Sequence, residues 1–235
     1  MDNSPHAMPP GSHGVGKATR LSLIRDRLQQ RWRSRRMREF ARRMSARPGT
    51  RVLDVGGNIE IWSLIDHPFR VTLLNTSVLQ ADSARPWRLP ACGTTWEFVE
   101  GDACDLQRFA DRSFDIVFSN SVIEHLGDDE RVERFAREVR RVGRSYWVQT
   151  PSYLFPIEAH TGWPFLWFYP RGLRESIARR LDARRANDPW FCPIAQTRYL
   201  TLQRMRQLFP EAATYTERVA GWPKSWSMYH VKPRP

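Results

Sequence analysis

The feature that most constrains this chain is a buried strand that runs directly into glycines. Residues 50–55, Thr-Arg-Val-Leu-Asp-Val, are largely apolar and rich in β-branched side chains, and Gly56-Gly57-Asn58 follows at once. A parallel strand of an α/β sheet presents its backbone to a ligand in this way, because glycine permits a sharp turn and leaves no Cβ in the path. Asp54 stands two residues before Gly56 and places a negative charge at the mouth of the predicted cleft. This charge favours a cationic ligand over a pyrophosphate.

The composition sets limits on the fold without identifying a function. The chain has 235 residues, which is enough for one domain with a buried core, and a net charge of +12. Nearly all of this charge is arginine, because the only lysines are Lys17, Lys224 and Lys232. Such a bias suits recognition of phosphate or carboxylate groups. It equally suits the codon usage of a GC-rich genome, so both explanations stay open.

The cysteines and the N-terminal residues indicate the cellular compartment of the protein. Cys92, Cys104 and Cys192 are odd in number and lack Cys-x-x-Cys spacing, so we predict no disulfide framework and no metal site. Residues 1–16 are rich in Pro, Gly, Ser and His, and we expect a disordered tail there, not a signal peptide. No stretch approaches the ~20 apolar residues that span a bilayer. The sequence therefore predicts a cytoplasmic protein.

A basic amphipathic helix is expected over residues 17–48, ahead of the sheet. Its apolar positions recur at three- and four-residue steps, with one slip in phase near Arg35: Leu21, Ile24, Leu28, Trp32, Met37, Phe40, Ala41 and Met44. The other face is expected to hold arginines: Arg25, Arg27, Arg31, Arg33, Arg35, Arg36, Arg38, Arg42 and Arg43. Such a face is usually solvated, yet it also suits a phosphorylated substrate, RNA or anionic lipid.

From residue 49 onward, strands and helices alternate. Strands are predicted at 50–55, 70–75, 95–100, 114–119 and 144–150, with helices at 59–65 and 128–142. This alternation indicates βαβ units and therefore a parallel α/β sheet. Further helices are predicted at 171–186 and 200–209, and strands at 212–219 and 226–231 form a predicted antiparallel hairpin.

Four motifs, in order, resemble those of the class I S-adenosylmethionine-dependent methyltransferases of the small bacterial type. They are Val52-Leu53-Asp54-Val55-Gly56-Gly57, Asn75 after the second strand, Asp102 after the third, and Phe114-Asp115-Ile116-Val117-Phe118-Ser119-Asn120 followed by Val122-Ile123-Glu124-His125-Leu126. The resemblance covers about residues 50–150. It implies a methyltransferase domain over residues 49–235, with a Rossmann-like, doubly wound and mostly parallel seven-stranded sheet whose last strand is antiparallel.

The resemblance also implies S-adenosylmethionine as cofactor, held at the carboxyl ends of the first four strands. Asp54 would hold its ammonium, the second strand would meet the ribose, and Asp102 would accept from the adenine amino group. The cofactor residues so implied are Asp54, Gly56, Gly57, Asn58, Asn75, Thr76, Asp102, Ala103, Ser119 and Asn120. Two departures predict weaker binding: Asn58 and Glu60 replace family glycines, and Asn75 replaces an acid.

Several of these residues also have structural interpretations. Asp54 is suited to cap the next helix, and Asp102 is suited to a turn. Asp115 resembles a family position but is interpreted as tying its strand to a neighbouring loop. His125 either orients a substrate or makes a structural hydrogen bond.

Residues 151–196 are expected to form a lid and substrate-binding insertion, because they follow the fifth strand at the edge where α/β sheets bind ligands. His160 is the first candidate for the base that removes a proton from a hydroxyl acceptor. Glu158 is expected to orient it or to bind substrate, and His125 completes the predicted catalytic set. The alternative is a lid that packs on the core, with His160 in a structural hydrogen bond.

Residues 163–170, Trp-Pro-Phe-Leu-Trp-Phe-Tyr-Pro, carry no charge and precede the basic helix 171–186. They suit either a membrane interface, with arginines on anionic lipid, or a pocket wall or core. We favour wall or core.

The sequence thus predicts methyl transfer from S-adenosylmethionine to a small-molecule, glycan or lipid-linked acceptor, to oxygen rather than carbon. The main rival is a catalytically inactive protein of the same fold that binds RNA or an anionic membrane. A nicotinamide oxidoreductase is disfavoured, because it requires Gly-x-Gly-x-x-Gly and the chain has Gly56-x-Asn58-x-x-Ile61.

Overall fold

The computed structural model describes the sheet and the long helix that precedes it. It describes residues 20–57, 59–65, 68–76, 93–159, 161–185 and 197–232. For residues 20–27, 184 and 185 it describes the backbone alone. The predicted tail, residues 1–16, therefore lies outside the described residues.

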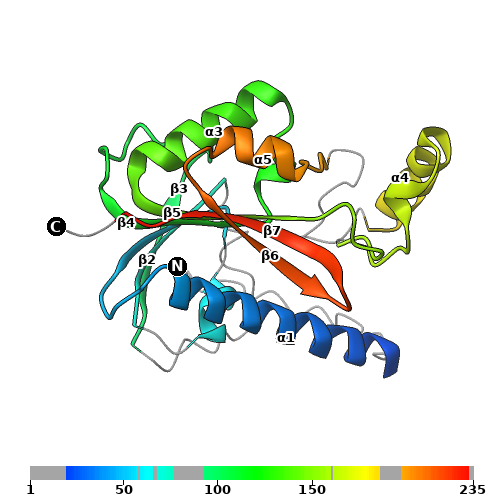
Figure 1. The fold of residues 1–235 in the computed structure, drawn as a ribbon, viewed down its shortest axis with the longest axis horizontal. Coiled ribbons are helices and arrows are strands. Elements are labelled where there is room, and N and C mark those ends of the chain that lie inside the picture. Colours follow the sequence, from blue (N-terminus) through cyan, green and yellow to red (C-terminus); the bar gives the residue numbers. More distant parts are fainter. Residues whose placement is uncertain are drawn as a thin grey trace, which may run out of the picture.

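Within these ranges, seven strands form one sheet (Figure 1). They are β1 (Arg51–Val55), β2 (Arg70–Asn75), β3 (Thr95–Glu100), β4 (Phe114–Asn120), β5 (Gly143–Pro151), β6 (Ala213–Val219) and β7 (Trp222–His230). The spatial order is β3-β2-β1-β4-β5-β7-β6. β1 to β5 are parallel, and β7 is antiparallel to both β5 and β6. The predicted seven-stranded sheet with an antiparallel last strand is confirmed.

The central strands are apolar on both sides because both faces of the sheet are covered. Val52, Leu53 and Val55 of β1 are all buried, and the register pairs Val52 with Ile116 of β4. Continuous apolar runs are typical of parallel strands under two helical layers. Since β1 to β5 run the same way, their carboxyl ends lie along one edge of the sheet, called here the carboxyl edge.

Helices cover both faces, so the doubly wound arrangement is confirmed. α1 (Arg20–Arg43) lies under one face, and α3 (Asp129–Val142) and α5 (Leu202–Leu208) lie over the other (Figure 1). α3 begins where the side chain of Asp128 accepts the N–H of Arg131 at 2.8 Å. Its buried stripe packs on the sheet: Val132, Phe135, Ala136, Val139 and Val142.

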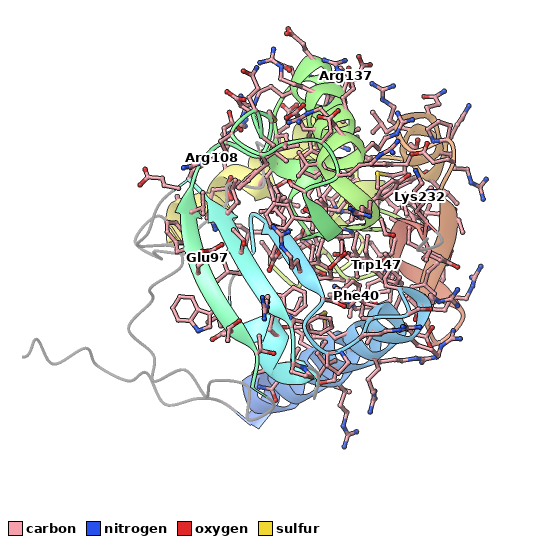
Figure 2. All side chains as sticks on the ribbon, turned by 90° about the vertical axis from the view of Figure 1, so that its left-hand side faces the viewer. Phe40, Glu97, Arg108, Arg137, Trp147 and Lys232 are labelled. Atoms are coloured by element: carbon pink, nitrogen blue, oxygen red, sulfur yellow. The ribbon has the colours of Figure 1, made fainter. Side chains whose placement is uncertain are left out.

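Phe40 anchors α1 to the sheet. Its ring lies 4.9 Å from that of Phe118, 5.8 Å from that of Trp147 and 5.9 Å from that of Trp62. Figure 2 shows Phe40 facing Trp147 of β5 between the helix and the sheet. Edge-to-face pairs of this kind add to the free energy of burial. The helix therefore belongs to the core of the domain.

The predicted lid carries α4 (Arg171–Arg185), which stands away from the sheet beyond the end of β5 (Figure 1). α4 has a small core of its own, where Ala178 and Leu166 are buried against Trp167 and Ile177. None of the helices in the described ranges is both long and apolar enough to cross a lipid bilayer.

Within the described ranges, three short helices are of the 3₁₀ type: η1 (Ile59–Leu64), η2 (Ile123–His125) and η3 (Leu166–Phe168). The predicted helix at 59–65 is the first of them.

β7 begins four residues earlier than the predicted strand at 226–231, because Ala220 and Gly221 adopt left-handed conformations that close a tight hairpin with β6.

Candidate active site

The turn after β1 requires glycine at both of its positions. Gly56 has φ +74°, and a Cβ there would lie 2.7 Å from Cγ2 of Val122. A Cβ on Gly57 would fall within 1.9–2.2 Å of the carboxylate of Asp54. The Gly56 N–H donates to the carbonyl of Leu74 at 2.7 Å, which ties the turn to β2. Asn58, also predicted to bind cofactor, lies outside the described residues.

Asp54 lies beneath this turn, and the prediction that its carboxylate sits at the cleft mouth is wrong. The side chain is fully buried, and its Oδ2 accepts the indole N–H of Trp62 at 2.8 Å. Its Oδ1 has no hydrogen-bond partner in the part of the chain that is described. Burial raises the pKa of Asp54 to about 7, and the Trp62 bond opposes this only in part. Asp54 can therefore act on a ligand only through the turn above it.

Asn75 connects the ends of β1 and β2. Its amide donates to the carbonyl of Gly57 at 3.3 Å, and its Oδ1 accepts the N–H of Thr76 at 2.8 Å. The carbonyl of Asn75 accepts the N–H of Gly101, which brings the end of β3 alongside. The predicted ribose residue thus lies between the glycine turn and Asp102.

Asp102 is accessible but already paired. Its Oδ1 accepts the N–H of Cys104 at 2.9 Å, and both oxygens lie within 3.1 Å of Nη2 of Arg131. Burial acts in the opposite direction, yet these two donors lower the pKa of Asp102. Its neighbour Ala103 is buried. Sequence analysis missed Arg131, although its place in the first turn of α3, after the third-strand motif, was a usable signal.

The end of β4 faces a different set of partners. The hydroxyl of Ser119 is buried and donates to the carbonyl of Val55 at 3.1 Å, so this side chain ties β4 to β1. Asn120 Oδ1 accepts from Nη1 of Arg36 at 2.7 Å. Ser121 follows with φ +59°, a left-handed conformation in which its hydroxyl donates to Gln149 at 3.0 Å. The chain turns sharply here, as it does after β1.

A pocket of about 430 Å³ opens beside Asn120 and Ser121 at the carboxyl edge. One face of α1, the ends of β4 and β5, the start of the lid and the start of β7 line it, and we call it the acceptor pocket. Its apolar wall consists of Leu28, Trp32, Phe155 and Ile157.

The polar end of this pocket is built around one carboxylate, that of Glu217 in β6. Its Oε2 accepts from Nη2 of Arg36 at 2.9 Å and from Nε at 3.2 Å, and from the hydroxyl of Ser225 at 2.8 Å. Nζ of Lys224 lies 3.7 Å from the same oxygen. Although burial opposes it, the charges of Arg36 and Lys224 lower the pKa of Glu217.

Arg36 and Lys224 were not predicted as site residues, and Arg36 was placed on the solvated face of the helix. That placement is wrong, because Arg36 is buried and lines the acceptor pocket. The signal was present in the spacing: Trp32, Arg36 and Phe40 stand four residues apart and share one face. Arg43 also turns inward and donates to the hydroxyl of Tyr229 at 2.8 Å.

The predicted catalytic residues fall in two places. Glu158 lines the acceptor pocket, and its oxygens accept from the hydroxyls of Thr161 and Tyr199, both at 2.6 Å. His160 lies outside the described residues. His125 lies 3.4 Å from the hydroxyl of Thr197 and is not among the residues that line the pocket.

Next to His125, Glu124 is a fully buried acid that accepts from the hydroxyl of Thr150 at 3.0 Å. Burial raises the pKa of Glu124 to about 8, so this side chain is largely protonated near neutral pH. It therefore adds little negative charge to the site.

The aromatic segment of the lid is largely exposed, so the interpretation of residues 163–170 as wall or core is wrong for most of it. Leu166 is buried, but Trp163, Phe165 and Phe168 are 37%, 50% and 56% exposed. Phe165 follows Pro164, which forms an isolated bridge with Ile157, and adopts a left-handed conformation with φ +53°.

Comparison with known families identifies the site. Residues 53–145 match the family model described as a methyltransferase domain. The match runs from β1 to the start of β5 and so contains the glycine turn, Asn75, Asp102 and the end of β4. Residues 53–145 thus resemble a methyltransferase domain. The family expected from the four motifs is thereby confirmed.

Relatives of this methyltransferase domain include the uncharacterized protein Rv1509 of Mycobacterium tuberculosis. It is 25% identical over 187 residues, which are 72% of this chain and 59% of that protein. The chain thus spans about three fifths of the length of the curated relatives it matches.

Solved structures of low identity share the fold. The PH0226 protein of Pyrococcus horikoshii has a TM-score of 0.54 at 19% identity, covering 89% of this chain and 91% of that one. A SAM-dependent methyltransferase of Archaeoglobus fulgidus also has a TM-score of 0.54, at 11% identity, with coverage of 90% and 99%. At these identities the likeness shows the fold alone.

The residues of the methyltransferase domain fit its cofactor. The glycine turn, the half-buried Asn75 and the accessible Asp102 form a contiguous polar edge, and beneath it Asp54 keeps one buried oxygen without a hydrogen-bond partner among the described residues. A cationic ligand suits this arrangement. Among the described residues, no group of three or more His, Cys, Asp or Glu side chains is placed to hold a metal ion. The assignment of individual cofactor residues stays a prediction.

Proposed function

We propose that this chain transfers the methyl group of S-adenosylmethionine to a small-molecule acceptor bound in the acceptor pocket. The observation that carries the proposal is the position of that pocket. It opens beside Asn120 and Ser121, directly after β4, at the edge that also holds the glycine turn. In open α/β sheets, ligands bind outside the carboxyl ends of the strands.

The cofactor supplies an electrophilic methyl group on a sulfonium when it is bound. The backbone at Gly56 and Gly57 would hold its amino-acid part, Asn75 and Thr76 its ribose, and Asp102 and Ala103 its adenine, with Ser119 and Asn120 near the sulfonium. Asp54 supports the turn from below and adds a negative potential when ionised.

The size of the acceptor pocket supports a small molecule. About 430 Å³ lies within the range of pockets that enclose drug-sized ligands. Arg36 and Asn120 fix one wall, and Trp32 and Phe155, edge to face at 6.4 Å, form another. Preformed walls of this kind hold an acceptor in line with a donor, and positioning alone supplies much of the rate.

We assign the accepting atom to oxygen and the base to His160. Its neighbours in sequence, Glu158 and Ala159, both line the pocket. In a panel of hydroxylated and carboxylated aromatic acceptors, His160→Ala is expected to abolish methylation of hydroxyls and to spare that of carboxylates, which are already ionised. Equal activity of mutant and wild type on both classes would rule out this role.

The proposal is tested by calorimetry with S-adenosylhomocysteine. We expect micromolar binding to the full chain, and binding at least tenfold weaker in Asp102→Asn, which loses half of its acceptor capacity. The matched control is Asp111→Asn, an exposed acid paired with Arg141 at 2.8 Å outside the site. Absence of binding to wild type, or equal affinities in all three proteins, would contradict the proposal.

A second candidate function, recruitment to anionic membranes, is favoured by the exposed aromatic residues of the lid. Phe165 and Phe168 form an exposed edge-to-face pair, and Leu173 on α4 is 52% exposed. α4 carries Arg171, Arg174, Arg179 and Arg180, of which all but Arg174 are exposed. Exposed aromatic rings beside arginines are typical of surfaces that dock at the headgroup level of anionic bilayers.

Cosedimentation with vesicles tests this second function. The chain is expected to bind phosphatidylserine-containing vesicles and not neutral phosphatidylcholine vesicles, and Phe165→Ser with Phe168→Ser should remove most of the binding. Trp96→Ser is the control, because Trp96 is 46% exposed on β3, away from the lid. Equal losses in both variants would contradict it.

A further inference from the structure

Two cations at the acceptor pocket, Arg36 and Lys224, share a single carboxylate. Both line the pocket, and both pair with the same oxygen of Glu217, which lies behind it. Glu158 already accepts from Thr161 and Tyr199, so most of its capacity is used. Buried charges without a counter-charge are costly, and proteins usually pair them.

Lys224 is the cation least satisfied by the protein. Its side chain is only 18% exposed, and its ammonium makes one distant ion pair, at 3.7 Å, with the oxygen of Glu217 that Arg36 and Ser225 already use. Among the described residues it forms no hydrogen bond. The ammonium also lies 5.0 Å above the ring of Trp32. Burial, and then the charge of Arg36, lower the pKa of Lys224 to about 8.

The surroundings of Lys224 specify the rest of a ligand. Trp32 contacts Phe155 edge to face, and Leu28 and Ile157 complete the apolar wall. At the other end, Arg36 reaches both Glu217 and Asn120, so the charged end and the end beside the cofactor edge are joined by one side chain. A ligand that fills this space has an apolar body and one negatively charged group.

We propose that Lys224, supported by Arg36, forms an anion subsite in the acceptor pocket, and that the methyl acceptor carries a carboxylate or a phosphate on an apolar body. That the ligand is the methyl acceptor rests on the proposed function. That it carries a negative charge is inferred from the pocket alone. The ammonium binds the anion as a point charge. Arg36 uses the same oxygen of Glu217, so Glu217 does not fully neutralise the ammonium. An uncharged analogue leaves the half-buried ammonium of Lys224 with only its distant ion pair to Glu217, and we therefore expect it to bind more weakly.

The experiment measures binding of benzoate, phenyl phosphate and the uncharged benzyl alcohol to the full chain by calorimetry. At least one anion is expected to bind tenfold or more tightly than benzyl alcohol, and which anion binds distinguishes a carboxylate acceptor from a phosphate acceptor. Lys224→Met should weaken that anion at least tenfold, and Lys224→Arg should restore part of the affinity. The control is Lys232→Met. Lys232 is exposed, and its backbone N–H donates to the hydroxyl of Ser145 at the opposite edge of the sheet (Figure 2).

Two readouts guard against a folding artefact. S-adenosylhomocysteine should bind Lys224→Met as it binds wild type, and benzoate affinity of the wild type should fall as pH rises above about 8, because Lys224 loses its proton while benzoate stays ionised. The groups that face Lys224 are Arg33, Arg36, Glu158 and Glu217.

The outcomes separate the two proposals. Cofactor binding without any preference for anions, or a pH-independent affinity, overturns the subsite and leaves the proposed function standing. Anion binding that Lys224→Met removes and Lys232→Met retains supports the subsite even if S-adenosylhomocysteine does not bind.

Discussion

The two halves of the carboxyl edge hold ionisable side chains of opposite sign. The half at the ends of β1 to β3 holds Asp54 and Asp102, the latter paired with Arg131, whereas the half at the ends of β4, β5 and β7 holds Arg36 and Lys224. A cation is favoured in the first half and an anion in the second. The difference shows how one edge can hold two ligands side by side without exchanging them, because each half repels the ligand of the other.

The halves also differ in how they keep their charges. On the acidic side, burial raises the pKa of Asp54 to about 7, and nothing but an indole opposes it. On the basic side, Arg36 stays fixed between Asn120 and Glu217. The acidic half thus titrates near neutrality through Asp54, whereas in the basic half Arg36 keeps its charge and Lys224, with a pKa lowered to about 8, titrates at higher pH.

The largest expected effect is on stability, and it comes from removing the Arg36 side chain, which links Asn120 and Glu217 in the basic half. Arg36→Met leaves Glu217 buried without its main partner, and breaking a buried ion pair in this way costs about 3–5 kcal/mol. Urea unfolding measures the loss. Arg38→Met, an exposed arginine on the same helix, should change stability by less than about 0.5 kcal/mol.

Arg36→Met combined with Glu217→Gln should recover much of this loss, since the uncompensated charge is gone. If Arg36→Met costs no more than Arg38→Met, the ion pair does not organise the pocket.

A smaller but still clear effect is expected on the acidic half. In Gly57→Ala the new Cβ would overlap the carboxylate of Asp54, so the turn must shift. Displacements near 1 Å can cost about a hundredfold, and we expect a loss of that order in affinity for S-adenosylhomocysteine. Gly172→Ala is the control, because a Cβ there meets nothing within 4 Å. Similar affinities in the two variants would remove the turn from the site.

The acidic half and its neighbour Glu124 also predict a pH dependence of stability. Asp54 and Glu124 have folded-state pKa values of about 7 and about 8, raised by burial from 3.8 and 4.5. The folded state therefore holds protons that the unfolded chain releases, and stability should fall as pH rises from about 5 to about 8.

Thermal unfolding at constant ionic strength should show this decline in wild type and a flatter profile in Asp54→Asn with Glu124→Gln. An identical slope in the two proteins would mean that these acids do not titrate across this range.

The positions of the strands were predictable from the sequence, whereas the burial of individual side chains was not. β2 and β3 begin and end at the predicted residues. β2 is a buried apolar or β-branched run with clear ends, whereas β3 is an edge strand with no fully buried residue. The same pattern placed Asp54 at the correct edge. Its burial depends on Trp62, which lies eight positions away on η1, and no strand periodicity reports on that contact.

The acceptor pocket was harder to predict because its partners are distant in sequence. Arg36 looked solvated among other arginines, and the carboxylate that draws it inward, Glu217, is 181 residues away. Lys224 follows a hairpin turn and gave no local signal. The aromatic residues of the lid were assigned to the interior from hydrophobicity alone, whereas Phe165 and Phe168 are about half exposed.

The contact between Arg36 and Glu217 has a consequence for biosynthesis. During translation α1 is synthesised before β6. Arg36 therefore cannot pair with Glu217 until nearly all of the sheet has been synthesised. A nascent chain that lacks the β6–β7 hairpin can assemble its glycine turn but not its charged pocket. The ion pair behind the acceptor pocket thus forms only after the strand that carries Glu217 has been made.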